Sequence, residues 1–230
     1  MKRGKNYKKI VKDLDKSTTY NLADGVKKVK GLSYSKFVGS LEIHVALKLS
    51  KDKDPKSLKG AISLPHTTSQ KEVKVAVFCT PEKEAEAKKA GADIVGLDNL
   101  VKDIKAGKMN FDVAIATPDV MPKIAVLGKE LGPKGLMPSP KNDTVTEDIA
   151  STVSEYKKGK QTFTCDPSGV VHMSVGKLDL EDEKLIENIH SALLAISNVV
   201  GKTPELMIKR LHLSPTMGAS VKISYSREEE

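Results

Sequence analysis

The order of hydrophobic patterns along this 230-residue chain is the feature that most constrains its fold. Toward both ends, apolar residues alternate with polar ones, a pattern typical of strands with one buried face. Between these segments, short apolar runs alternate with helical stretches, and Gly91 and Gly107 stand where helices should end. The middle segment therefore predicts a small open α/β layer structure. An inserted middle domain is one explanation of this order, and the pattern alone does not decide it.

The two end segments are predicted to combine amphipathic helices with alternating strands. Leu185 and Ile189 begin an apolar stripe that continues with helical spacing to Ile196. Residues 166–169 have the composition of a tight turn, so the runs on either side of it predict a hairpin. The other elements expected here are a helix over 22–29 and strands over 41–49, 61–64, 206–213 and 220–225.

In the middle segment, strands are expected over 73–78, 94–95 and 111–115. Thr80 and Pro81 suit the cap and the first position of a helix, and a second helix is expected over 100–105. Thr144 and Glu147 have the spacing of a capping box, and a helical stripe follows as far as Tyr156. A third helix is therefore expected after this box.

The charge of the chain narrows the class of partner. The net charge of +8 favours a polyanion, whereas a lysine-rich solvated surface is the alternative that charge alone leaves open. Only Arg3, Arg210 and Arg227 are arginines. Lysine neutralises phosphate but lacks the bidentate geometry with which arginine reads base edges. A nucleic acid bound by this chain should therefore be recognised mainly through its backbone and shape.

The sequence gives little support to an enzyme. The glycine-rich stretch 128–135 has the spacing of neither phosphate-binding loop, and it follows a predicted helix rather than a strand. Asp93, Asp112 and Asp119 lie near strand boundaries, where α/β enzymes keep active sites, but caps and turns explain them better. We expect no enzyme, no cofactor and no metal site. An enzyme that uses the middle segment remains the second hypothesis.

The histidines allow two interpretations. His44, His172 and His212 occupy polar-facing positions of strand-like runs, so they are either exposed strand residues or contacts to RNA sugar and phosphate. His190 lies beside the stripe of its helix and is expected to pack or to face solvent. None of the histidines has the spacing of a helical metal pair.

The sequence also indicates the compartment. Cys79 and Cys165 lie far apart in apolar runs, so they are expected in the core rather than in a disulfide. The basic N-terminal segment has no apolar region after it, and the longest apolar run is too short to span a bilayer. A reducing, aqueous compartment is expected.

Several stretches of the sequence resemble the ribosomal protein L1 family. Residues 131–141 read Leu-Gly-Pro-Lys-Gly-Leu-Met-Pro-Ser-Pro-Lys, which is similar to the signature loop of that family. Residues 116–121 and 216–218 match two further family patterns, and 36–38 and 64–66 match in order and spacing. The resemblance covers nearly the whole chain.

The resemblance implies a two-domain α/β fold with a discontinuous first domain. A split α+β RNA-binding domain would be formed by residues 1–66 and 159–230, and a Rossmann-like three-layer α/β domain, residues 67–158, would be inserted into it. The family's first domain binds large-subunit ribosomal RNA and forms the mobile stalk that assists release of deacylated tRNA from the exit site. Many bacterial members also repress translation by binding the messenger of their own operon.

The implied partners are large-subunit ribosomal RNA, exit-site tRNA and the chain's own messenger, with no membrane and no cofactor. The resemblance implies a monomer when free and a cytoplasmic place in the large ribosomal subunit of bacterial type, with an organellar origin left open. A repressor that acts only on messenger is a third hypothesis, which the sequence does not separate from the first because one RNA surface would serve both.

The family pattern also implies which residues bind RNA. Phe37 alone could be an ordinary core residue, but the neighbouring Lys36 and Gly39 favour a place on the surface. Together with two basic residues of the predicted strands, the expected RNA-binding residues are Lys36, Phe37, Ser40, Glu42, His172, Arg210, Thr216, Met217 and Gly218. The signature loop contributes Gly132, Pro133, Gly135, Met137, Pro138, Pro140 and Lys141. The chain departs from the family pattern at two places. One is Pro215, and the other is residues 67–69, near the expected interdomain crossing, where the family has glycines.

Overall fold

The computed structural model describes residues 4–12, 14, 15, 18–49, 54–66, 73–107 and 109–225. The chain forms two compact units: unit 1 consists of Met1–Ser69 and Phe163–Glu230, and unit 2 of Gln70–Thr162. Both units mix helices with strands, which confirms the predicted fold class. Residues 67–69, where the chain departs from the family's glycines, lie outside the described residues.

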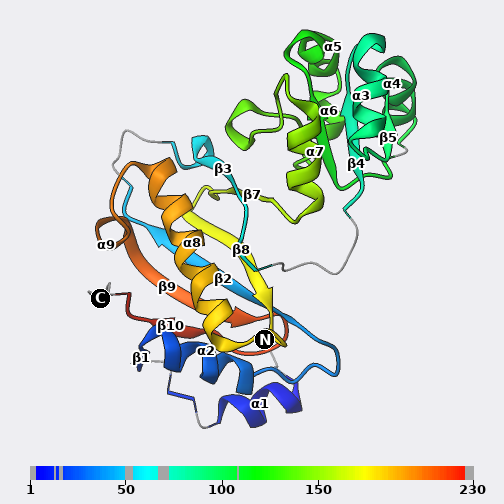
Figure 1. Ribbon diagram of the computed structural model, residues 1–230. Helices are drawn as coiled ribbons and strands as arrows, with labels where there is room; N and C mark the ends of the chain where they lie inside the picture. Colours follow the sequence, from blue (N-terminus) through cyan, green and yellow to red (C-terminus); the bar gives the residue numbers. More distant parts are fainter. Residues whose placement is uncertain are drawn as a thin grey trace. The chain divides into compact units, whose positions relative to one another are not determined.

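A five-stranded sheet in unit 1 combines strands from both ends of the chain (Figure 1). Its strands are β1 (Thr19–Tyr20), β2 (Ser40–Leu47), β8 (Val170–Lys177), β9 (Ile208–Pro215) and β10 (Val221–Ile223). Their order is β1-β10-β9-β2-β8; β1 pairs parallel with β10, and the other pairs are antiparallel. On β8, Gly176 pairs with Leu41 and Ser174 with Glu42, so Val175 between them forms a bulge.

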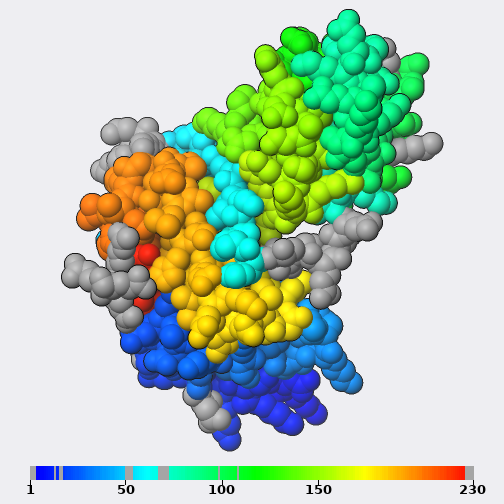
Figure 2. All heavy atoms as spheres, viewed as in Figure 1, coloured from blue at the N-terminus to red at the C-terminus, as the bar shows by residue number. Residues whose placement is uncertain are grey.

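Two helices, α2 (Leu22–Gly31) and α8 (Asp182–Val200), cover one face of this sheet. Leu41, Ile43 and Val45 of β2 are fully buried, and the predicted apolar stripe of α8 is buried with them. In Figure 1, α8 crosses in front of the sheet, and Figure 2, viewed from the same side, shows atoms of α8 at the surface. As the alternation of apolar and polar residues predicted, one face of β2 lies in the core and the other is open.

Unit 1 also contains smaller elements around the sheet. These are α1 (Lys5–Val11), a 3₁₀ turn (Pro55–Ser57), β3 (Lys59–Ile62) and α9 (Pro204–Met207), and β7 (Gln161–Thr164) runs from the last residues of unit 2 into unit 1. The strand predicted over 206–213 is wrong in its first two residues, which belong to α9. Pro204 begins this helical turn because its fixed φ suits the first helical position.

The hairpin predicted around residues 166–169 is only partly correct. The turn forms, since Gly169 N–H donates to the Asp166 carbonyl and Asp166 N–H donates to the Val170 carbonyl. The flanking strands, however, enter different sheets: β7 pairs with β3, and β8 pairs with β2. Within the described residues a single bridge, Cys165 to Val171, joins the two runs. Local composition thus identified the turn but not the partner of each strand.

Unit 2 is a three-layer α/β structure. Its parallel sheet has the order β5-β4-β6, with β4 (Val75–Phe78), β5 (Ile94–Val95) and β6 (Val113–Ala116). The helices are α3 (Glu84–Lys89), α4 (Asp98–Lys105), α5 (Met121–Ala125), α6 (Gly128–Leu131) and α7 (Ile149–Lys157). Ala76 and Phe78 pack into a core with α4, α5 and α6, whereas Val75 and Val77 pack with α3 and α7. Helices therefore cover both faces, as expected for a buried parallel sheet.

The predicted capping box at the start of α7 is wrong. The N-cap is Asp148, whose carboxylate accepts a hydrogen bond from Ser151 N–H at 3.1 Å. The hydroxyl of Thr144 instead bonds the backbone of Ser139, and Glu147 precedes the helix. Asp148, four residues after Thr144, supplies the side-chain acceptor that caps the helix. The spacing of Thr144 and Glu147 does not show that Asp148 competes for the cap position.

We expect the substitution Asp148→Ala to lower the free energy of unfolding of unit 2 by about 1 kcal/mol, because it removes this cap. Glu147→Gln is the matched control and should change it by less than about 0.3 kcal/mol. Urea unfolding followed by circular dichroism measures both values. An equal loss in the two variants would show that the stabilisation is not specific to the Asp148 cap.

Candidate nucleic-acid interface

Two loops lie together at one end of the five-stranded sheet: residues 33–39, before β2, and residues 216–220, after β9. We call these two loops the tip. Ser40 N–H donates to Thr216 Oγ1 at 2.8 Å, and Thr216 N–H donates to the Ser40 carbonyl at 3.0 Å. The Thr216 hydroxyl donates to that same carbonyl at 3.2 Å. The structure therefore brings together residues that are 176 positions apart and that the sequence predicted at one site.

The side chains at the tip point outward. Phe37 is 58% exposed and Met217 41%, and Lys36 is also exposed. Ser35 Oγ donates to the Phe37 carbonyl at 2.8 Å, which helps to fix the loop that carries this ring. Of the two interpretations of Phe37, the surface position is confirmed. An exposed aromatic ring beside a lysine is a suitable contact for a nucleotide, since the ring stacks while the amine neutralises phosphate.

Gly218 lies in close contact with the residues that flank the two loops. A Cβ atom at this position would lie 2.5 Å from the Leu32 carbonyl oxygen and 2.5 Å from Pro215 Cγ. Tyr34 N–H donates to the Met217 carbonyl at 3.3 Å in the same region. The glycine is therefore required by the packing of the tip itself, whatever else contacts it.

The open face of the sheet carries a row of three histidines. The register places His44 of β2 between His172 of β8 and His212 of β9. The Nδ1 atoms of His44 and His172 are 2.8 Å apart, and their rings meet edge to face with centroids 5.0 Å apart. His172 is exposed and the other two are partly exposed. The interpretation as exposed strand residues is confirmed, and a contact with RNA stays a prediction.

Two other predicted residues lie on this open face. Glu42 pairs with Ser174 and Ser214 on the neighbouring strands, one step from His44 toward the tip. Arg210 pairs with Ala46, one step from His44 in the other direction. Ser40, Glu42, the histidine row and Arg210 thus follow one another along a single face, which makes the tip and the sheet one continuous surface.

The environment keeps two of these histidines neutral. Burial lowers the pKa of His44, and the neighbouring His172 lowers it further. Burial also lowers the pKa of His212, with the charges of Arg210 and Lys222 acting in the same direction. Because the pKa of each folded-state imidazole is lowered, both rings are neutral near pH 7 in the unliganded protein.

The signature loop in unit 2 is an internally bonded loop with an exposed basic surface. Gly135 has φ +71° and donates its N–H to the Gly132 carbonyl, and Ser139 N–H donates to Thr144 Oγ1 at 2.8 Å. The Tyr156 hydroxyl donates to the Asn142 carbonyl at 2.6 Å. Pro138 is buried and Met137 partly buried, whereas the exposed members of the loop are Gly132, Pro133, Lys134, Gly135, Pro140 and Lys141.

Asp93 and Asp112, two of the three aspartates near strand boundaries in unit 2, accept hydrogen bonds from the backbone. Asp93 accepts from Val75 N–H at 2.9 Å, and Asp112 accepts from Lys74 N–H at 3.2 Å. Cys79 and Cys165 are buried, as predicted. Across the described residues, no three histidine, cysteine or carboxylate side chains gather where a metal ion could be held. The same residues include no helix long and apolar enough to cross a membrane.

Two residues near the interface were not predicted. Lys177 donates through Nζ to Ser40 Oγ at 3.2 Å, beside the tip. Lys209 lines a hollow of the open face together with Arg210. No local signal distinguishes these lysines from the many others in the sequence, and only the strand register places them.

The comparison with known proteins identifies the family of the chain. The family model described as "Ribosomal protein L1p/L10e family" matches residues 26–219. A "Large ribosomal subunit protein uL1" from Thermosipho melanesiensis is 44% identical over 225 residues, 97% of each chain. Proteins of the same name from Phocaeicola vulgatus and Rickettsia rickettsii (strain Sheila Smith) are 41% and 42% identical, over 98% and 96% of this chain and 97% and 92% of theirs.

These matches first define the class of protein, which is a structural protein of the ribosome and not an enzyme. The hypothesis of an enzyme built on the middle segment is thereby set aside. The chain belongs to the ribosomal protein L1p/L10e family, as its motifs predicted.

Proposed function

We propose that this chain is a constituent of the large ribosomal subunit and binds large-subunit ribosomal RNA through the tip and the open sheet face of unit 1. The observation that carries the proposal is the tip itself. Phe37, Met217 and Lys36 project into solvent from two loops whose backbones are tied together through Ser40 and Thr216. A rigid backbone with outward aromatic, thioether and amine groups loses little entropy when a folded RNA docks on it.

The hydrogen bonds assign different tasks to the predicted contact residues. Phe37 and Met217 offer surface for stacking and apolar contact with sugar or base, and Lys36 neutralises phosphate. The Thr216 hydroxyl is already bonded to Ser40, so it serves mainly to hold the two loops together. Glu42, His172 and Arg210 extend the contact along the sheet.

The resemblance to the family supports finer proposals. We assign residues 1–66 and 159–230 to the RNA-binding domain and residues 67–158 to the inserted domain. Within the cytoplasmic large subunit, the protein would form the mobile stalk that assists release of deacylated tRNA from the exit site. The same RNA surface would also bind the messenger of its own operon and repress translation, with a monomer as the free form.

The test is a titration of the purified full-length protein with a large-subunit ribosomal RNA fragment over a series of salt concentrations. Affinity should fall steeply as salt rises, since phosphate contacts release counterions. Phe37→Ala and Thr216→Val should each weaken binding by about 1–3 kcal/mol. Leu194→Ala truncates a side chain that is also exposed, on α8, and should leave affinity unchanged.

A wild-type affinity no greater than that for an unrelated duplex would contradict the proposal. Equal losses in Phe37→Ala and Leu194→Ala would contradict the location of the site. The operon messenger, titrated in parallel, tests repression separately: it should compete with the ribosomal RNA and lose affinity in the same variants.

A further inference from the structure

The histidine row borders a basic hollow on the open face of unit 1. The hollow has a volume of about 350 Å³, and its polar wall is formed by His44, Ser168, Lys209, Arg210 and His212. It lies toward the end of β2 and the start of β9, away from the tip, because Ala46 and Arg210 pair there. Among the described residues, the wall of this opening has two lysine or arginine cations, two imidazoles and a hydroxyl, and no carboxylate, a composition that suits a phosphate group.

The contact between His44 and His172 determines how many protons the pair can hold. A separation of 2.8 Å between two Nδ1 atoms requires that one nitrogen carries a hydrogen and the other does not. The first added proton can enter the outer nitrogen, Nε2, of the donor ring, and this leaves the contact intact. A second added proton would have to enter the accepting Nδ1 and would break it. A proton on the outer nitrogen of His44 is therefore compatible with the contact when His44 is the donor ring.

Other charged and titratable groups face this row from each neighbouring element. Glu42 Oε2 lies 4.0 Å from His44 Nε2, and Asp166 Oδ2 lies 3.7 Å from His172 Nε2. Lys222 of β10 pairs with His212, and Tyr7 and Asp15 line a second hollow with that histidine. The remaining basic groups are those of Lys209 and Arg210 on β9.

The balance of these groups makes the charge of the row depend on what binds to it. Glu42 opposes the lowering of the His44 pKa by burial and by His172, but it does not overcome it. Lys222 and Arg210 oppose a charge on His212 until an anion arrives. A phosphate in the hollow would oppose this effect, since it would neutralise the charges of Lys209 and Arg210 in the wall and attract a proton to the imidazoles.

We propose that His44 and His212, with His172 as the hydrogen-bond partner of His44, form a proton-coupled site for an RNA backbone phosphate, which takes up about one proton from solution when the phosphate binds. The inference rests on the proposed binding of RNA by unit 1, and it adds a second contact, separate from the tip, together with its dependence on pH. RNA supplies the phosphate because the site lies on the same open face as the tip residues. Protons move from solvent to an imidazole nitrogen, and no covalent bond forms or breaks.

The sign of the pH dependence follows from linkage. Unliganded His44 and His212 each have a pKa below the ordinary value of 6.5, and a bound phosphate would raise it. The complex therefore holds more protons than the free protein between these two pKa values, and affinity rises as pH falls through that window. One proton taken up corresponds to at most about tenfold in affinity per pH unit.

The experiment measures the affinity of the full-length protein for the ribosomal RNA fragment at pH 8, 7 and 6 and at constant ionic strength. Calorimetry at pH 7 in two buffers with different heats of ionisation counts the protons taken up. Wild-type affinity should rise about tenfold between pH 8 and pH 6. The gap between wild type and His44→Gln, or His212→Gln, should widen over the same range. His190→Gln is the matched control, because His190 lies on α8 beside Tyr225 and away from the row.

Each outcome decides the proposal. A pH slope that His44→Gln and His212→Gln keep unchanged would arise in the RNA and would overturn it, as would the absence of proton uptake. Normal RNA binding at all three pH values without a slope overturns this inference but leaves the proposed function standing. If no RNA binds specifically, the proposed function fails first. NMR titration of the histidines with inorganic tripolyphosphate then shows whether the row is only a free-phosphate site, a result that would also overturn the RNA assignment.

Discussion

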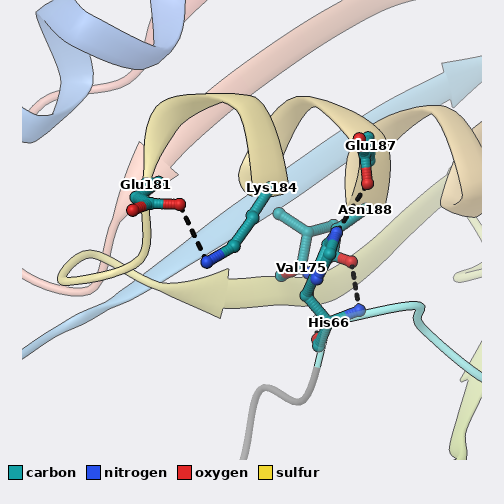
Figure 3. A network of polar contacts seen from close by, with 6 residues as sticks. All are labelled: His66, Val175, Glu181, Lys184, Glu187 and Asn188. Carbon is teal, nitrogen blue, oxygen red and sulfur yellow. Dashed lines mark hydrogen bonds and ion pairs between the residues drawn. The ribbon is translucent and has the colours of Figure 1, made fainter.

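Replacing Asn188 by leucine is expected to lower the free energy of unfolding of unit 1 by about 4 kcal/mol, although leucine has a similar size and suits a buried helix position. Asn188 is fully buried on α8, and its amide makes three hydrogen bonds to backbone groups. It accepts from His66 N–H at 3.0 Å and donates to the His66 carbonyl at 3.2 Å and to the Val175 carbonyl at 2.7 Å (Figure 3).

The Val175 carbonyl has a special need for this donor. Val175 is the bulged residue of β8, so its backbone does not take part in the regular ladder with β2. Leucine at position 188 would leave that buried carbonyl without its donor and would release the chain at His66. An unsatisfied buried backbone group costs about 1–3 kcal/mol, and the substitution creates more than one.

Urea unfolding of the full-length protein, followed by a probe in unit 1, measures the effect. Glu187→Gln is the matched control: Glu187 is the preceding residue, its side chain is 64% exposed and it contacts the His66 ring, so its loss should cost less than about 1 kcal/mol (Figure 3). A cost below about 1 kcal/mol in Asn188→Leu would contradict this account of the bulge.

Asn188 also shows which parts of the fold the sequence can predict. The stripe from Leu185 to Ile196 predicted the buried face of α8 correctly, because helical periodicity is a local property. A polar residue on that buried face is visible in the sequence, but its partner is not. Asn188 is needed as a hydrogen-bond donor to the bulged residue Val175 of β8, and this bulge arises from the pairing of β2 with β8. The hairpin prediction around residues 166–169 was only partly correct for the same reason: a turn is a local feature, whereas strand pairing is not.

The residues of the candidate site also divide into features that local patterns predict and features that depend on strand pairing. Alternation along β2 placed His44 on a polar face, and family motifs selected Phe37 and Thr216. Neither signal could show that His44 would lie between His172 and His212, because that juxtaposition requires the register of three strands. The bond from Ser40 N–H to the Thr216 hydroxyl was equally out of reach, and it changes the expected task of that hydroxyl from contact to support.

Gly218→Val is expected to have the second large effect, with a loss of about 3 kcal/mol in the stability of unit 1 and of at least about a hundredfold in RNA affinity. The new Cβ would lie 2.5 Å from the Leu32 carbonyl oxygen, which is fixed at the end of α2 and moves less easily than a side chain. Relief of the clash requires the loop 216–220 to shift. That shift would displace Met217 and strain the bonds between Thr216 and Ser40.

Gly31→Ala provides the matched control, because Gly31 is the neighbour of Leu32 and a Cβ there meets nothing within 4 Å. Alanine at this last helical position should leave RNA affinity unchanged and raise stability by about 0.5 kcal/mol, since it restricts the unfolded chain. Thermal unfolding and the RNA titration, run on both variants, separate the two effects. If Gly218→Val keeps wild-type affinity at a temperature where it is folded, the tip is not the RNA contact. If it also keeps wild-type stability, the close approach of the two loops is not required for folding.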